Sequence, residues 1–97
     1  MIDPHTRLIR ALIARSENRA TLRHGESEAW ASVTFTGARH LLRLAMPAEM
    51  ADAFAAELDA HEFAIPGHIV ADIAVTARHK AATGTTLEIE ALTIEDR

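Results

Sequence analysis

The scarcity of large apolar side chains is the feature that most limits what this chain can fold into. Of its 97 residues 47 are apolar, but 20 of these are alanine, which leaves 27 larger side chains for a core. A buried alanine methyl contributes little at ~25 cal/mol per Å² of apolar area, and so short a chain buries a modest share of its surface. Either the fold is marginal or a second copy of the chain adds core, and we favour the second. We expect a single α+β domain over residues 1–97.

Composition also excludes several classes of protein. The chain has no cysteine, so it can form neither disulfides nor a cysteine-type zinc site. Its first four residues, Met-Ile-Asp-Pro, lack the basic stretch and apolar run of a signal peptide, and no apolar run approaches the ~18 residues of a membrane span. We therefore expect a cytoplasmic protein with no membrane partner. Nine arginines against one lysine, with the alanine excess, are typical of a GC-rich bacterial genome.

Charge is spread unevenly along the chain. Residues 1–45 carry seven arginines against four acids, and residues 46–97 carry three bases against ten acids. The basic half could bind RNA, or the two halves could face each other within one fold or across a dimer. The net charge of −4 repels phosphate, and RNA binding also lacks an aromatic stacking platform. We therefore do not expect a nucleic-acid partner for the arginines concerned, which are Arg7, Arg10, Arg15, Arg19 and Arg23.

The periodicity of apolar residues predicts an α+β fold. Asp3-Pro4 is a typical helix start, with an N-cap followed by proline. We expect an N-terminal helix, a three-stranded antiparallel meander, a second helix and a C-terminal β-hairpin, in a single antiparallel sheet with the helices packed on one face. The predicted helices cover 4–16 and 47–60, and the predicted strands cover 19–24, 29–36, 39–46, 68–80 and 86–95.

Two finer features concern the last hairpin. The apolar phase of the final strand slips by one residue at Ala91-Leu92, which predicts a β-bulge there. A hairpin centred on residue 84 would form two cross-strand ion pairs, Lys80–Glu88 and Arg78–Glu90.

Catalytic motifs are absent from the sequence. It contains no phosphate loop, dinucleotide fingerprint, nucleophile elbow or helical zinc-protease signature, which favours a protein that is not an enzyme. Six histidines are the first residues to consider. We expect His40 and His79 on the core-facing side of their strands, as satisfied core-edge residues. His61 and His68 flank a Pro-Gly turn near carboxylates and could bind a metal or move a proton. Their separation is not set by the sequence, so we assign no metal ligand and no cofactor.

The strongest functional signal is the sheet face opposite the helices. Trp30, Leu41 and Val70 together make that face too apolar for a solvated surface. Tryptophan and arginine are also the types enriched at interface hot spots. A covering helix, a self-complementary dimer and a groove for a ligand or partner protein remain open explanations. The candidate interface or ligand-binding residues are Trp30, Arg39, Leu41, Arg43, His68, Val70 and Asp72.

Two functions fit this face. The favoured one is a non-catalytic binding or assembly module that forms a homodimer through the sheet face, with the arginines meeting acidic residues. The alternative is a small enzyme or ligand-binding protein for an anionic or metal-chelating metabolite. In that case Asp72 would orient the imidazole of His68, which moves the proton, and Arg43 would hold a carboxylate or phosphate.

Overall fold

One antiparallel sheet organises the chain. The computed structural model describes residues 3–60 and 64–96. Its strands pair in the order β1-β2-β5-β4-β3, and every pairing is antiparallel. The predicted α+β class and the antiparallel sheet are therefore confirmed. The elements in chain order are α1 (Pro4–Arg15), β1 (Thr21–Ala31), β2 (Thr36–Met46), α2 (Ala48–Ala60), β3 (Ala64–Ile65), β4 (His68–Ala81) and β5 (Gly84–Glu95).

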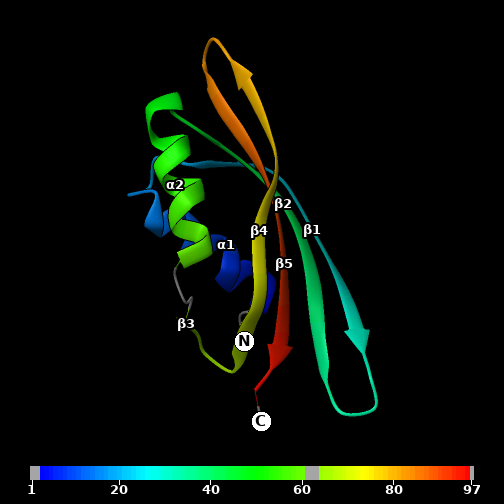
Figure 1. Ribbon diagram of the computed structural model, residues 1–97. Helices are drawn as coiled ribbons and strands as arrows, with labels where there is room; N and C mark the ends of the chain where they lie inside the picture. Colours follow the sequence, from blue (N-terminus) through cyan, green and yellow to red (C-terminus); the bar gives the residue numbers. More distant parts are fainter. Residues whose placement is uncertain (1–2, 61–63, 97) are drawn as a thin grey trace.

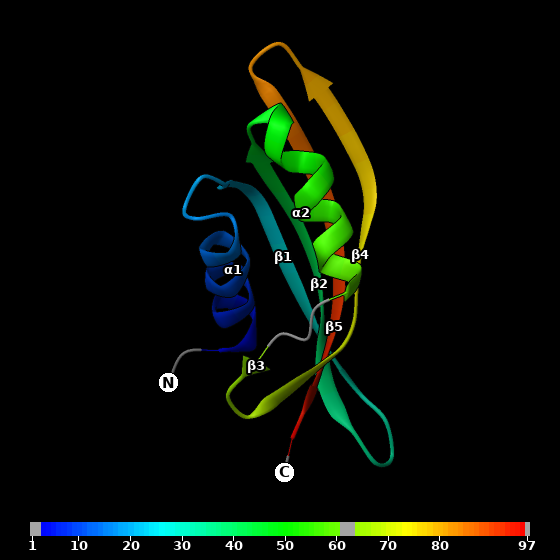
Figure 2. The ribbon, with the colours of Figure 1, turned by 60° about the vertical axis from the view of Figure 1, so that its left-hand side comes forward.

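Both helices lie on the same face of the sheet, as predicted (Figures 1 and 2). α1 packs over β1 and β2, and α2 packs over β4 and β5. The core lies between these two layers, and its centre is the pair of middle strands, β2 and β5. The large apolar side chains that are fully buried in it are Leu8, Leu12, Leu42, Leu44, Leu58, Leu87 and Ile89.

Short-range signals set both ends of α1. The Asp3 side chain accepts a hydrogen bond from the backbone N–H of Thr6 (2.8 Å), so it caps the first turn. At the other end Glu17 and Asn18 adopt left-handed φ values of 56° and 62°, which stops the helix. The Ser16 hydroxyl is buried there and accepts a hydrogen bond from the backbone N–H of Ala20 (2.9 Å).

The predicted three-stranded meander is wrong, because β1 is one continuous strand. The predicted strands 19–24 and 29–36 require a turn near Gly25, a residue type common in turns. Gly25 instead lies inside β1, where a Cβ would be 3.3 Å from Nε2 of His5. Glycine at this position lets α1 approach the strand closely. The turn into β2 comes later and is closed by a hydrogen bond from the N–H of Ser32 to the carbonyl oxygen of Phe35 (2.7 Å).

The predicted bulge at Ala91-Leu92 is also wrong. β5 alternates without a break, whereas β4 contains two irregularities, at Ala71 and Thr76. A bulge reverses the alternation, so side chains before it lie on the face opposite to the one that the pattern after it predicts. Val70 and Ile69 come just before the bulge at Ala71. Val70 therefore packs against the core, and Ile69 lies on the far side of the sheet.

The hairpin between β4 and β5 turns earlier than predicted. Ala81 is opposite Gly84, so the loop is centred between residues 82 and 83. Both ion pairs expected from the later centre are therefore wrong, namely Lys80–Glu88 and Arg78–Glu90. Two other pairs form in this region, Arg78–Asp52 at 2.5 Å and His79–Glu88 at 3.0 Å.

Ion pairs also join the basic first half of the chain to its acidic second half. These contacts support the interpretation that the two halves face each other within one fold. Four of the six side chains are exposed and the other two are only half-buried, so each pair stabilises the fold only slightly. The pairs are Arg15–Glu57 at 3.2 Å, Arg19–Glu49 at 3.1 Å and Arg43–Glu88 at 3.2 Å.

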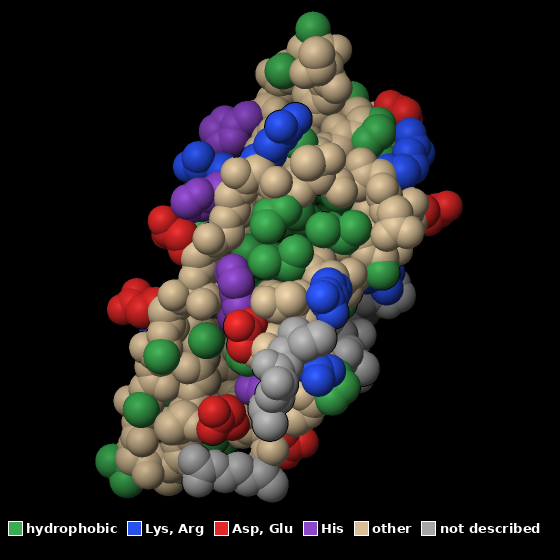
Figure 3. Space-filling view, turned by 180° about the vertical axis from the view of Figure 1, so that it is seen from behind, with side chains coloured by type: hydrophobic (Ala, Val, Ile, Leu, Met, Phe, Trp, Pro, Cys, Tyr) green, Lys and Arg blue, Asp and Glu red, His purple; other side chains and the backbone are tan. Residues whose placement is uncertain are grey.

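β1 forms one edge of the sheet and contributes little to the core. Every residue along it is exposed except Trp30, which is half-buried. α1 covers the strand only in part, since Leu22 remains 37% exposed. Figure 3 shows hydrophobic side chains in a recess beside this strand. The two hairpins project from opposite ends of the sheet, and the end with the β4–β5 hairpin is called the upper end below (Figure 1).

Gly37 in β2 is a position where a side chain should not be tolerated. A Cβ there would overlap the carbonyl oxygen of Thr93 and lie 3.0 Å from Nε1 of Trp30. We expect Gly37→Ala to lower the free energy of unfolding by about 1–3 kcal/mol, because strand pairing holds both neighbours in place. Urea unfolding followed by circular dichroism measures the loss. Gly25→Ala is the comparison, since its Cβ would meet the side chains of His5 (3.3 Å) and Leu42 (3.5 Å) and no backbone atom within 3.6 Å. Equal losses in the two variants would contradict this explanation.

Candidate functional site

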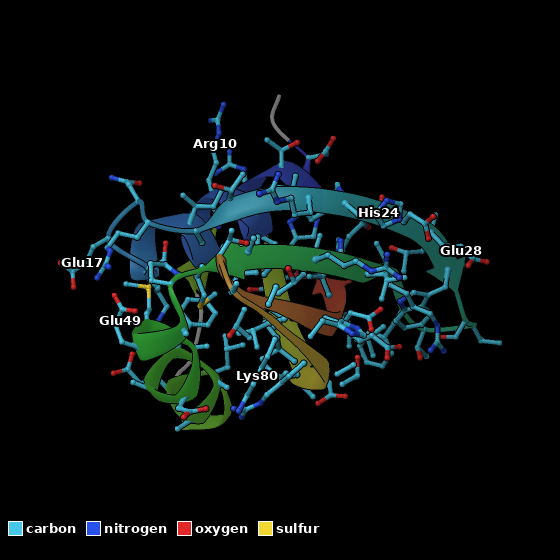
Figure 4. All side chains as sticks on the ribbon, turned by 90° about the horizontal axis from the view of Figure 1, so that it is seen from above. Arg10, Glu17, His24, Glu28, Glu49 and Lys80 are labelled. Carbon is cyan, nitrogen blue, oxygen red and sulfur yellow. The ribbon has the colours of Figure 1, made fainter. Side chains whose placement is uncertain are left out.

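The face of the sheet opposite the helices, called the open face, carries the candidate site. Within the described residues no helix covers it (Figures 1 and 2). Figure 4 shows His24 and Glu28 of β1 on the side of the sheet away from the helices. Strand pairing aligns its residues in rows across β1, β2, β5 and β4. From the lower end upwards these rows are Trp30–Gly37–Ile94–Ile69, Glu28–Arg39–Leu92–Asp72, Glu26–Leu41–Glu90–Ala74 and His24–Arg43–Glu88–Ala77.

Five of the seven residues predicted for this site lie on the open face, and two do not. Val70 packs against the core from the helix-covered side. His68 shares that side by strand alternation, and its Nδ1 donates to the carbonyl oxygen of Pro66 (3.4 Å). The bulge at Ala71 explains both differences, because it separates these two positions from the phase of the strand beyond it. The residues on the open face are Trp30, Arg39, Leu41, Arg43 and Asp72.

Sequence reasoning missed two apolar members of the open face, Leu92 and Ile94. Both are half-buried and stand in neighbouring rows. They were missed because the buried positions at the two ends of β5 are threonines, which were read as polar. Thr85 is 3% exposed and Thr93 is fully buried. Counting these threonines as core residues restores an unbroken two-residue period along the strand and reveals both apolar neighbours.

Trp30 stands at the lower end of the open face. Its indole ring lies against Gly37, which has no side chain to displace it. The indole N–H is buried and has no hydrogen-bond partner among the described residues. The part that this tryptophan presents to the surface is therefore apolar.

A shallow hollow of about 550 Å³ lies over the middle rows of the open face. Half-buried Leu41 contributes apolar surface to it. In the part of the chain that the structure describes, the side chains of Arg39, Glu28 and Glu90 make no ion pair. The third carboxylate of the hollow, Glu26, lies 3.0 Å from Nε2 of His24. The hollow therefore offers one guanidinium and two carboxylates without an ion-pair partner among the described residues. The residues that line it are Glu26, Ser27, Glu28, Arg39, His40, Leu41 and Glu90.

Glu88 joins β2 to β4 above this hollow. Its carboxylate accepts a hydrogen bond from Nε of Arg43 (3.2 Å) and lies 3.0 Å from Nε2 of His79. The hydrogen bond from His79, with that from Arg43, lowers the pKa of the Glu88 carboxyl below its usual value. His79 was expected on the core-facing side, and its exposed place here corrects that expectation. The predicted group of His68, Asp72 and Arg43 is not brought together. His68 lies on the helix-covered face, and Asp72 and Arg43 lie on the open face two rows apart.

His40 is buried on the helix-covered side of β2, as predicted, and is 2% exposed. Its Nδ1 lies 3.0 Å from Nδ1 of His5 in α1, and its Nε2 lies 2.9 Å from Oγ1 of Thr93 in β5. The two rings are nearly parallel, at 7°, with centroids 5.2 Å apart. That spacing and the short N–N distance mean that the rings meet edge to edge through one hydrogen bond.

The partners of His40 determine where its proton lies. The Thr93 hydroxyl donates to the carbonyl oxygen of Ala38 (3.4 Å), so it accepts from the Nε2–H of His40. Nδ1 of His40 is then an acceptor, and the Nδ1–H of His5 donates to it. Burial, followed by the neighbouring His5, lowers the pKa of His40 to about 4, which keeps the ring neutral. This chain of hydrogen bonds ties α1 to the sheet.

The remaining hypothesis for the histidines was a metal site at the Pro-Gly turn. One of its two members, His61, lies outside the described residues. Within 3–60 and 64–96, no group of three or more His, Asp or Glu side chains is arranged to hold a metal ion. Over the same ranges, neither helix combines the length and apolar character needed to cross a membrane.

No protein-family model, curated protein or solved structure matches this chain. A function for it therefore has to be argued from the site itself.

We expect acid to weaken the fold through His40. Its pKa is about 4 in the folded chain, against an ordinary value of 6.5, so the unfolded chain binds the proton more readily. The stabilisation is complete above pH 6.5 and falls by roughly 3 kcal/mol as the pH drops to 4. Urea unfolding across this range should show a steeper loss for the wild type than for His40→Gln, which cannot titrate. An NMR titration midpoint of the His40 ring near 6.5 would refute the prediction.

Proposed function

We propose that this protein is a non-catalytic binding or assembly module that forms a homodimer through the open face. The observation that carries the proposal is the arrangement at the hollow, where Arg39, Glu28 and Glu90 make no ion pair with any described residue and lie beside an apolar surface. Catalysis needs acid, base and binding groups that converge. The three residues considered for an enzyme or metabolite-binding protein lie apart, so that alternative has less support.

The four central residues of the open face form a rectangle that suits a two-fold axis. Arg39 and Glu90 occupy opposite corners, and Leu41 and Leu92 occupy the other two. An axis along the leucine diagonal would place each leucine against its own counterpart. It would also place each Arg39 against Glu90 of the second copy, giving two equivalent ion pairs. From ordinary strand spacings, the two sheets would cross at about 70°, nearer to orthogonal than to aligned packing.

The charges at the centre of the open face suit a second copy better than they suit a basic partner. A basic partner would bring cations against Arg39, whereas a copy of the open face supplies a carboxylate for it. Burying Leu41 and Leu92 would also add apolar contact to a chain with few large apolar side chains. The open face is acidic overall, with carboxylates at Glu26, Glu28, Asp72, Glu88 and Glu90 and guanidinium groups at Arg39 and Arg43.

Charge reversal tests the proposed interface. The wild type is expected to be a dimer by size-exclusion chromatography with light scattering. Arg39→Glu and Glu90→Arg should each be monomeric, because each variant places like charges against each other across the axis. An equimolar mixture of the two variants should recover the dimer, since each chain then supplies the charge that the other lacks.

The matched control is Arg10→Glu, which makes the same charge change away from the interface. Figure 4 shows Arg10 on α1, pointing away from the sheet. This variant should remain a dimer, and circular dichroism checks that all three variants are folded. A monomeric wild type overturns the proposal. A dimer that survives both interface substitutions would move the contact to another surface, such as the exposed edge of β1.

A further inference from the structure

A second polar hollow lies at the upper end of the sheet, where β1 begins, β2 ends and the β4–β5 hairpin turns (Figure 1). Its volume is about 250 Å³. Two arginines and four threonines are among the residues that line it, and no carboxylate is. The hollow therefore combines positive charge with hydroxyl groups, in contrast to the acidic rows of the open face below it.

Strand pairing builds the floor of this hollow. Thr21 of β1 and Thr86 of β5 both stand opposite Ala45 of β2, one on each side. The short alanine side chain between two longer ones leaves a depression. Thr83, from the hairpin loop, lines its upper side.

The two arginines are available to a ligand in different degrees. Arg23 is the extra residue of a bulge in β1, which takes its side chain out of the strand alternation. It makes no ion pair within the described residues. Arg19 pairs with Glu49 at 3.1 Å, but the two side chains are 49% and 72% exposed. Such exposed pairs are weak, so an anion can compete for Arg19.

We propose that this hollow binds a dianionic phosphate group, either free or carried by a small phosphomonoester. Guanidinium groups bind phosphate oxygens through charge-assisted hydrogen bonds, and threonine hydroxyls donate to the oxygens that remain. A polynucleotide fits less well, because no aromatic side chain lines the hollow to stack a base. The acidic rows below would also repel a longer polyanion.

NMR titration of the labelled wild-type protein tests the site. Phenyl phosphate and inorganic phosphate are compared with sodium chloride at equal ionic strength. Both phosphates should cause saturable shifts of the Thr21, Arg23 and Thr86 amide signals and of the Arg23 side-chain N–H. Arg23→Ala should weaken phenyl phosphate binding at least about fivefold, and Thr86→Val should weaken it about threefold. Tighter binding of phenyl phosphate than of inorganic phosphate would identify the monoester as the ligand, and equal binding would identify the phosphate group alone.

Arg10→Ala is the matched control, because it removes one exposed arginine elsewhere and should bind like the wild type. Circular dichroism and light scattering of Arg23→Ala check that its fold and oligomeric state are unchanged. The proposal is overturned by phosphate-induced shifts that do not saturate, or by equal binding in Arg23→Ala. A single-stranded oligoribonucleotide that binds where phenyl phosphate does not would also overturn it.

Discussion

The pairing of β2 with β5 is the interaction on which the rest of this structure depends. It joins two hairpins that are far apart in the sequence, and it places Leu44 opposite Leu87 at the centre of the core. The same two strands bring Arg39, Leu41 and the acidic residues of β5 together on the open face. One register thus determines both the buried face and the candidate site. Gly37 protects that register, because a larger residue would push the two strands apart.

The small core explains why both faces of the sheet matter. α1 and α2 cover one face, and the hydrogen bonds between His5, His40 and Thr93 add a polar link between α1 and the sheet. That link requires a neutral His40, so the attachment of α1 is sensitive to acid. On the opposite face, none of the described elements covers the half-buried leucines. A second copy of the sheet would supply that layer, which is the remedy that the scarcity of large apolar side chains suggests.

The distribution of charge over the surface follows from the fold and not from the division of the sequence into a basic and an acidic half. Contacts such as Arg43–Glu88 neutralise part of the asymmetry within a single copy. The charge that these contacts leave unneutralised lies on two surfaces. One is the acidic open face with Arg39 in its middle, and the other is the basic hollow at the upper end. We propose a different partner for each of these surfaces, a second copy of the chain for the first and a phosphate group for the second.

Local signals in the sequence determined the two helices, the strands β2, β4 and β5, and five residues of the open face, because caps and periodicities act over a few residues. Only the tertiary structure decided the rest. Gly25 resembles a turn residue in the sequence, and only the contact with His5 explains a glycine inside a strand. The bulge at Ala71 is defined by the pairing of β4 with β5, which the sequence of β4 alone does not contain. The basic hollow likewise depends on Ala45 standing between side chains from two other strands. Strand register is a sum of long-range contacts, and no short stretch of sequence contains both sides of them.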